Sequence, residues 1–274
     1  MRKIGLHLRI IDSLIETAQR AAHLGLKTFQ CFLIHQITKK YLSLSDKEVK
    51  EFVALRPLFD TLYIHGAYWI NISGIRCEHA KRLLLKEIDI AKRLQFTHYI
   101  LHPGSAIGWN EHKKGIDCLV RVLNDILKNE NDITIVLENT AHGSLSIGSD
   151  LHDFKIIREK LAFPEKVLFC LDTAHAYAFG YDIADINAQN DFMYLLNKTV
   201  GDAIGLIHLN DSQEKLGFKR DRHAVLGQGK IGTAALKNFI LHEKLCNVPI
   251  IMEMPRTAYN IEINILNMVK EWHQ

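Results

Sequence analysis

Six successive apolar runs of the sequence each end in a residue that can bind a metal ion. The runs have the length and composition of short buried strands, and their final residues are His65, His102, Glu138, Asp172, His208 and Glu253. Neighbours in this series are 37, 36, 34, 36 and 45 residues apart, which is roughly the length of a strand, a helix and the two loops between them. Because each polar residue stands at the same end of its strand, the side chains can converge on one site, as they do in α/β enzymes.

Further donors lie close to this series. His175 follows Asp172 by three residues, and Asp221 and His223 alternate along an extended segment, so that their side chains share a face. The full set holds only imidazole nitrogens and carboxylate oxygens, which suits Zn²⁺, with Mn²⁺ or Fe²⁺ as alternatives at one site. Nine donors are more than one ion with three protein ligands and an open position can use. We therefore expect a cluster of two or three divalent ions.

The elements that must position these donors form a regular alternation. Eight strands are predicted, at residues 3–8, 28–34, 61–65, 98–102, 133–138, 166–172, 203–208 and 248–253. Each is followed by a segment with helical spacing of apolar residues, and Ser13-x-x-Glu16 and Ser45-x-x-Glu48 mark the starts of the first two helices. No linker or low-complexity segment intervenes. Residues 1–274 are therefore predicted to form one domain, an α/β fold of the (β/α)8 TIM-barrel type.

Composition and charge place few limits on function. The chain holds 34 Lys and Arg against 31 Asp and Glu, so its overall charge does not indicate an acidic partner. A surface for phosphate groups would have to be local, and Lys215, Lys219, Arg220 and Arg222 form the candidate cluster. The amino terminus lacks the apolar region of a signal peptide, and no run approaches the length of a membrane span. We expect a cytoplasmic protein with no membrane partner.

The cysteines agree with that location. Five are present, at positions 31, 77, 118, 170 and 246, without a Cys-x-x-Cys motif. An odd number of thiols in apolar surroundings fits a reducing compartment better than a disulfide framework. We therefore expect buried thiols rather than disulfides.

A cluster of divalent ions at the mouth of a barrel fits two types of reaction. In two-metal hydrolysis the ions lower the pKa of a bound water and neutralise the charge of an in-line displacement, which suits a phosphodiester. A sugar isomerase or epimerase on the same barrel would use one ion and fewer ligands, so nine donors favour phosphoryl chemistry. A third hypothesis is a binding protein with a vestigial site, against which the intact donor set argues.

In several long motifs the chain resembles the endonuclease IV family of abasic-site endonucleases, and the resemblance covers nearly its whole length. The motifs are His65-Gly-Ala-Tyr-Trp-Ile-Asn71, His102-Pro-Gly-Ser105, Leu137-Glu-Asn-Thr-Ala141, Leu171-Asp-Thr-Ala-His175, His208-Leu-Asn-Asp211, Asp221-Arg-His223 and Leu226-Gly-Gln-Gly229, with Glu253 beyond them. The resemblance implies a (β/α)8 barrel with a trinuclear zinc centre, three zinc ions per chain. It also implies cleavage of DNA on the 5′ side of an abasic site, in base excision repair.

The same resemblance implies a ligand set for each zinc ion. His65, His102 and Glu138 would hold the first ion, Glu138, Asp172, His208 and Glu253 the second, and His175, Asp221 and His223 the third. Glu138 would bridge two ions beside the attacking hydroxide and act as the general base.

Outside the donor set the chain departs from the family pattern. After the second strand the family carries an Asn-Gln-Arg loop whose arginine enters the minor groove of DNA, and here the aligned residues are His35-Gln36-Ile37. After the third strand the chain has Tyr68-Trp69, where the family has Tyr and an aliphatic residue. We hypothesise that Trp69 stacks in the gap left by a flipped abasic nucleotide, the alternative being that it packs on the barrel rim. Tyr68, Trp69 and Arg222 are the expected DNA contacts of a protein that acts on duplex DNA as a monomer.

Overall fold

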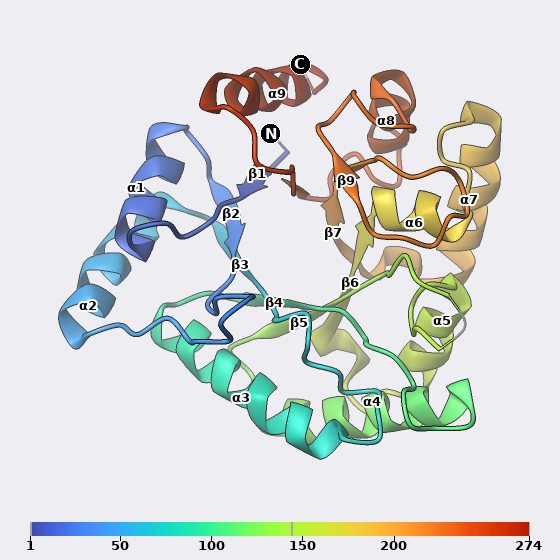
Figure 1. The fold of residues 1–274 in the computed structure, drawn as a ribbon, viewed down its shortest axis with the longest axis horizontal. Coiled ribbons are helices and arrows are strands. Elements are labelled where there is room, and N and C mark those ends of the chain that lie inside the picture. The colour runs from blue at the N-terminus through green and yellow to red at the C-terminus, as the bar shows by residue number, and fades with distance from the viewer. Residues whose placement is uncertain (1, 144, 274) are drawn as a thin grey trace.

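The computed structural model describes residues 2–143 and 145–273. At its centre is a closed barrel of eight parallel strands, whose order around the barrel follows the chain (Figure 1). The strands are β1 (Ile4–His7), β2 (Thr28–Cys31), β3 (Thr61–His65), β4 (His98–Leu101), β5 (Thr134–Glu138), β6 (Val167–Asp172), β7 (Ile204–His208) and β10 (Ile250–Met252). The predicted (β/α)8 TIM barrel is therefore confirmed.

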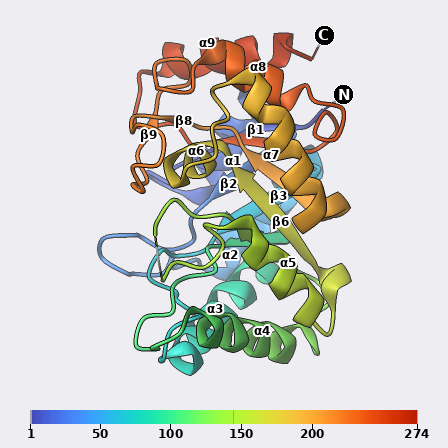
Figure 2. The same cartoon turned by 90° about the vertical axis from the view of Figure 1, so that its right-hand side faces the viewer.

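Helices surround the barrel and cover the outer faces of its strands (Figure 1). They are α1 (Leu14–His23), α2 (Asp46–Leu55), α3 (Cys77–Arg93), α4 (His112–Leu127), α5 (Leu151–Lys160), α7 (Ile186–Thr199), α8 (Thr233–Ile240) and α9 (Tyr259–Glu271). Figure 2 shows α5 and α7 on either side of β6. Both predicted caps form: Ser13 accepts from the backbone N–H of Glu16, and Ser45 and Glu48 complete a reciprocal capping box.

Three elements at the barrel mouth, a helix and a pair of short strands, were not predicted from the sequence. A short helix, α6 (Thr173–Phe179), follows β6 directly, because the carboxylate of Asp172 caps it by accepting from the backbone N–H of His175 at 2.7 Å. Beyond β7, the two-residue strands β8 (Asp211–Ser212) and β9 (His223–Ala224) pair in antiparallel fashion. The extended segment of Asp221 and His223 is thereby held against the mouth.

The barrel interior explains why the donors share one level. A layer of buried side chains, one from each of six strands, fills the interior: Tyr63, Ile100, Val136, Cys170, Leu206 and Ile251. Side chains along a strand alternate between its two faces, so the residue two places further on points the same way. Two places beyond each member of this layer stands one of the six predicted donors at the strand ends. The donors therefore form the next layer, at the carboxyl end of the barrel.

Two of the cysteines contradict the prediction of thiols. Cys77, at the start of α3, and Cys118, in α4, form a disulfide with a Cα–Cα distance of 6.9 Å. The prediction failed because the packing of α3 on α4 brings together residues that are 41 positions apart. Cys31 and Cys170 are buried free thiols, and Cys246 is half-buried. The cytoplasmic location loses this support and stays a prediction. Within the described residues, no helix combines the length and apolar character that crossing a bilayer requires.

Candidate metal centre

The predicted donors meet at the carboxyl end of the barrel in three groups of atoms. In the first group, Nε2 of His65 and Nε2 of His102 each lie 3.1 Å from Oε2 of Glu138. In the second, Nδ1 of His208 lies 2.8 Å from Oε1 of Glu138 and 3.2 Å from Oε2 of Glu253. The two oxygens of Glu138 therefore face different groups, as a bridging carboxylate requires.

The third group is built on α6 and the segment before β9. Oδ1 of Asp221 lies 3.1 Å from Nε2 of His175 and 3.2 Å from Nε2 of His223. Oδ2 of Asp172 lies 3.5 Å from Nε2 of His223 and 3.9 Å from Nδ1 of His208. Asp172 therefore stands between the second and third groups, and all nine predicted donors lie in one continuous cluster.

Hydrogen bonds fix which ring nitrogen faces the cluster in four of its five histidines. In three of them Nδ1 donates to a backbone carbonyl oxygen at 2.8 to 3.0 Å: His65 to Gly66, His175 to Asn139 and His223 to Glu253. A carbonyl oxygen only accepts, so Nδ1 carries the hydrogen and Nε2 can offer its lone pair to the cluster. His208 is turned round, because its Nε2 bonds Oε1 of Gln30 at 2.8 Å and leaves Nδ1 for the cluster. Such support of the remote nitrogen is typical of histidines that bind metals.

The charges of the cluster also suit divalent cations. Burial alone would raise the pKa of the Glu138 carboxyl, but the neighbouring imidazoles of His208 and His102 hold it well below the usual range, by charge where a proton takes the place of a metal ion and by hydrogen bonds. The pKa of Asp221 is likewise lowered by His175 and His223 in spite of burial. Both carboxylates are therefore ionised at neutral pH, which is the form that binds metal.

Three nitrogens of the cluster lack any hydrogen-bond partner among the described residues. They are the buried Nε2 atoms of His102, His175 and His223. A buried polar atom without a partner is costly in free energy. Because these atoms point at carboxylate oxygens about 3 Å away, a cation between them would satisfy nitrogen and oxygen together. The nine residues thus fit metal ions with nitrogen and oxygen ligands, as zinc accepts.

Comparison with known proteins agrees with this geometry. Residues 18–270 match the family model described as "Xylose isomerase-like TIM barrel". A "Probable endonuclease 4" of Thermosipho melanesiensis is 32% identical over 93% of both chains, and an "Apurinic-apyrimidinic endonuclease" of Caenorhabditis elegans is 31% identical over 98% of this chain and 70% of its own length. The chain belongs to the endonuclease IV family. The crystal structure of endonuclease IV from Thermus thermophilus superposes with a TM-score of 0.83 at 28% identity and 98% coverage of each chain.

Contacts with Asp211 explain why this endonuclease IV family chain has glycine at positions 227 and 229. The buried carboxylate of Asp211 accepts from the backbone N–H groups of Gly227, Gly229 and Ile231, each at 3.0 Å. A Cβ at Gly229 would stand 2.3 Å from Oδ1 of Asp211, so only glycine fits there. This Gly-x-Gly motif therefore closes a turn just after β9 and fixes the segment that carries Asp221 and His223.

Two residues that support the centre were missed in the sequence. Gln30, on β2, is fully buried, and besides holding His208 its amide nitrogen donates to Oε1 of Glu253 and lies 2.7 Å from Nδ1 of His7. His7, on β1, in turn has Nδ1 3.2 Å from Oε1 of Glu253. A glutamine on a strand carries no sequence signal of this role, although the polar residue in an otherwise apolar run, Thr28-Phe-Gln-Cys31, could have raised the question.

The three expected DNA contacts of this endonuclease IV family chain occupy different settings. Tyr68 is 56% exposed and its ring lies over the rings of His65 and His102, with centroids 5.3 and 5.6 Å away. Trp69 is half-buried against the core, and the ammonium group of Lys39 lies 5.2 Å from its ring centre. The side chain of Arg222 is 60% exposed, with Nε 3.4 Å from a carboxylate oxygen of Glu214. Tyr68 is therefore the one of the three that overhangs the metal centre.

Proposed function

We propose that this protein is a zinc-dependent endonuclease that hydrolyses the DNA phosphodiester on the 5′ side of abasic sites during base excision repair, with three zinc ions per chain. The observation that carries the proposal is the continuous cluster of nine donors, in which Glu138 and Asp172 each stand between two groups of nitrogen atoms. Three groups of donors match three ions. We assign His65, His102 and Glu138 to the first ion, Glu138, Asp172, His208 and Glu253 to the second, and His175, Asp221 and His223 to the third.

The residues of the centre would divide the work of hydrolysis among them. When bound, zinc ions lower the pKa of a coordinated water and neutralise the charge that develops on the phosphate. Glu138 is fully buried and ionised, and we assign it the proton of the attacking water. Tyr68 lies across one side of the centre, where we assign it to contact the substrate. Manganese or iron in place of one zinc ion would leave these roles unchanged.

The surroundings of the centre fit a DNA backbone that is cleaved at one phosphate, because a cavity reaches the centre and a basic loop lies beyond it. A cavity of about 270 Å³ reaches the centre and is lined by His7, Arg9, Phe32, Tyr68, His223 and Glu253, among others. Beyond it the exposed loop between β8 and β9 carries Lys215, Lys219, Arg220 and Arg222, which we assign to the DNA backbone. Tyr68 and Trp69 are the proposed contacts at the lesion. The named relatives are an apurinic-apyrimidinic endonuclease and probable endonucleases 4, and abasic duplex DNA is the substrate that we propose here.

The decisive experiment is incision of a duplex that carries one tetrahydrofuran abasic analogue. We expect the zinc-loaded protein to cut 5′ to the analogue and to leave a 3′-hydroxyl that a DNA polymerase can extend. Plasma emission spectroscopy on the same sample should count three zinc ions per chain. The proposal is wrong if the fully loaded protein leaves this duplex intact. Size-exclusion chromatography with light scattering should show the expected monomer, and cell fractionation the expected cytoplasmic location.

Metal content and turnover together decide between the proposed function and its two alternatives. A sugar isomerase or epimerase on this barrel would need one divalent ion, so a count of one would favour it. A binding protein with a vestigial site would retain abasic DNA without turnover. The fold alone does not separate these functions, because the matching family model is named for xylose isomerase.

A further inference from the structure

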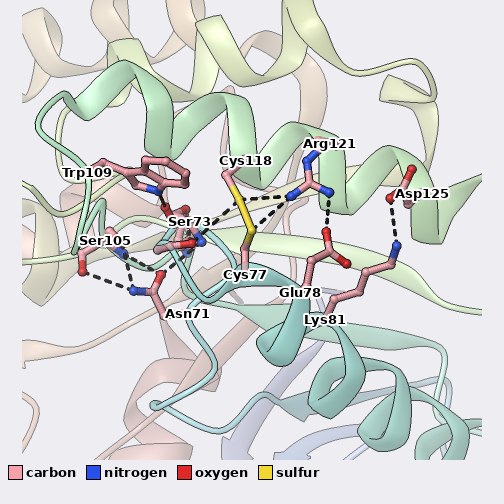
Figure 3. The surroundings of a disulfide bond; sticks show 12 residues. Asn71, Ser73, Cys77, Glu78, Lys81, Ser105, Trp109, Cys118, Arg121 and Asp125 are labelled. Carbon is pink, nitrogen blue, oxygen red and sulfur yellow. Dashed lines mark hydrogen bonds and ion pairs between the residues drawn. A yellow bond between two sulfur atoms is a disulfide. The ribbon is translucent and has the colours of Figure 1, made fainter.

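The disulfide joins the two helices that follow neighbouring loops on one side of the barrel mouth. Cys77 is the first residue of α3, directly after the β3–α3 loop (residues 66–76), and Cys118 lies in α4, which follows the β4–α4 loop (residues 102–111). The β3–α3 loop directly follows His65, and the β4–α4 loop directly follows Leu101, the last residue of β4. Figure 3 shows the bond between the two helices, to the right of the loop residues Asn71, Ser73 and Ser105.

Hydrogen bonds already join the two loops without the disulfide. Asn71 Nδ2 donates to the carbonyl oxygen of Ser105 at 2.9 Å, and the backbone N–H of Ser105 donates back to Asn71 Oδ1 at 3.0 Å. Ser73 Oγ donates to the carbonyl oxygen of Pro103 at 2.6 Å, and Trp109 Nε1 donates to that of Ser73 at 3.0 Å (Figure 3). Loss of the S–S bond would therefore leave the loops in place, held less tightly.

A guanidinium group lies against both sulfur atoms. Nη2 of Arg121 is 3.2 Å from Sγ of Cys77 and 3.6 Å from Sγ of Cys118, and its other amino group pairs with Glu78 (Figure 3). In the reduced protein this cation would stabilise a thiolate, and the N-terminus of α3 would favour a thiolate at Cys77 in the same direction. A stabilised thiolate makes a disulfide easier to reduce and, once reduced, faster to react with an oxidant.

Among the described residues, no guanidinium group donates a hydrogen bond to the sulfur of any of the other three cysteines. Cys31 and Cys170 are both fully buried, and burial raises the pKa of the Cys31 thiol, so that it stays protonated and unreactive. Cys246 is half-buried and contacts the carbonyl oxygen of Glu243 at 3.0 Å. Cys246 therefore serves as an internal control for surface thiols.

We propose that Cys77 and Cys118 form a reversible oxidation site for small hydroperoxides, and that its oxidation tightens the two loops beside the metal centre. The bond is nearly covered, with Cys77 4% and Cys118 6% exposed, so a small oxidant reaches it more readily than a protein does. The reaction requires neither zinc nor DNA, and its test is therefore independent of the nuclease activity proposed above.

The chemistry balances in two steps. The thiolate of Cys77 attacks one oxygen of the hydroperoxide, so that an S–O bond forms, the O–O bond breaks, and the alkoxide or hydroxide that leaves takes a proton. The sulfur of Cys118 then attacks the resulting sulfenic acid, forming the S–S bond and releasing water with the proton of the Cys118 thiol. Two thiols are oxidised by two electrons, and one hydroperoxide is reduced to an alcohol or to water. Exchange with two low-molecular-weight thiols reverses the reaction.

The experiment uses the whole zinc-loaded chain and hydrogen peroxide. After native reduction with a phosphine and removal of the reductant, alkylation under denaturing conditions should label all five cysteines. One equivalent of peroxide should lower this number to three, with the loss mapped by mass spectrometry to the Cys77 and Cys118 peptides. The disulfide closes a ring between residues 41 positions apart. Its formation should raise the melting temperature by roughly 5–15 °C and slow amide hydrogen exchange in both loops.

Variants test the role of the guanidinium group. Arg121→Met should slow formation of the bond by roughly three- to tenfold, because less of the attacking thiol is ionised. Arg93→Met, the same change at an exposed arginine of α3 that pairs with Asp46, should leave the rate unchanged. Cys246→Ser should alter neither the rate nor the melting temperature.

Three results would overturn the proposal. A bond that resists native reduction would be a permanent cross-link. Oxidation that proceeds no faster at Cys77 than at Cys246 would show an unreactive pair, and an Arg121→Met variant that oxidises at the wild-type rate would remove the assigned cause.

Discussion

Six strands of the barrel supply a proposed metal ligand from their last residue or the residue just after it, whereas the other two supply supporting residues. On the donor side, β3 to β7 and β10 place carboxylates and imidazoles in one layer. On the other side, β1 and β2 carry His7 and Gln30, which contact Glu253 and His208 without joining the three groups. A metal ion dictates the chemical type of its ligands, whereas a supporting residue needs only a hydrogen bond in the right direction. The donor side can therefore be recognised in the sequence, and the supporting side only in the structure.

The largest effect is expected at the donor side, from Glu138→Ala. The change removes the carboxylate that faces two groups and the proposed base, so incision of abasic duplex should fall on the order of a thousandfold or more, and bound zinc should fall below three ions per chain. Incision rate and metal content are to be measured on the same preparation. The matched control is His98→Gln, a half-buried histidine at the opposite end of β4, which desolvation holds neutral by lowering its pKa to about 4. Full activity of the Glu138 variant would contradict its assignment.

The next effect is expected at the supporting side, from Gln30→Ala. Loss of its amide frees His208 to rotate and removes a hydrogen-bond donor from Glu253, so zinc affinity of the second group should drop about 10–100-fold. Competition with a chromophoric chelator measures this affinity without any substrate. Gln189→Ala is the control, because the side chain of Gln189 is similarly buried and its hydrogen bonds within the described residues go to Ile183, Ala235 and Asn238, none of which is a proposed ligand. Equal affinities in the two variants would mean that the supporting side does not act on the metal.

Smaller effects are expected at the rim, where Tyr68 and Trp69 can be compared directly. Stacking of a base or an exposed base step on an aromatic ring contributes about 1–3 kcal/mol. Because Tyr68 overhangs the centre and Trp69 is packed under Lys39, Tyr68→Ala should reduce the preference for abasic over intact duplex more than Trp69→Ala does, with metal content unchanged in both. Binding of paired abasic and intact duplexes gives both preferences. If Trp69→Ala leaves discrimination untouched and lowers only stability, the tryptophan packs on the rim and does not stack on DNA.

The sequence predicted what periodicity and ligand type control. The regular spacing of the apolar runs was enough to predict the barrel. The alternation of side chains along each strand explains why the residues at the strand ends share one level. The disulfide was out of reach, since its two residues meet only through the register of α3 on α4. Helix α6 was missed because its stability depends on the cap by Asp172, a residue already interpreted as a ligand. Gln30 was missed because a neutral amide can form hydrogen bonds in many settings, so its residue type does not indicate a metal centre.

The smallest effect on the metal centre is expected from Glu87→Gln, which tests whether a buried carboxyl behind the proposed ligands is neutral or ionised in the folded protein. Glu87, on α3, is fully buried, accepts from the hydroxyl of Tyr99 at 2.7 Å, and has Oε1 without a partner among the described residues. Burial raises its pKa to about 7. The folded state therefore binds this proton more tightly than the unfolded state, so its contribution to stability is complete below about pH 4.5 and is lost as the pH rises through 7.

Between pH 5 and pH 8 this loss amounts to about 2–3 kcal/mol of the free energy of unfolding. Glutamine keeps an acceptor for Tyr99 and cannot ionise, so Glu87→Gln should be more stable than the wild type at pH 8 and similar to it at pH 5. Urea unfolding of both proteins at the two pH values gives the difference, in which other titrating groups cancel. Parallel pH profiles would show that Glu87 is already ionised in the folded protein. Incision should be the same in both proteins, because Glu87 lies behind the β3–α3 loop and contributes no donor to the centre.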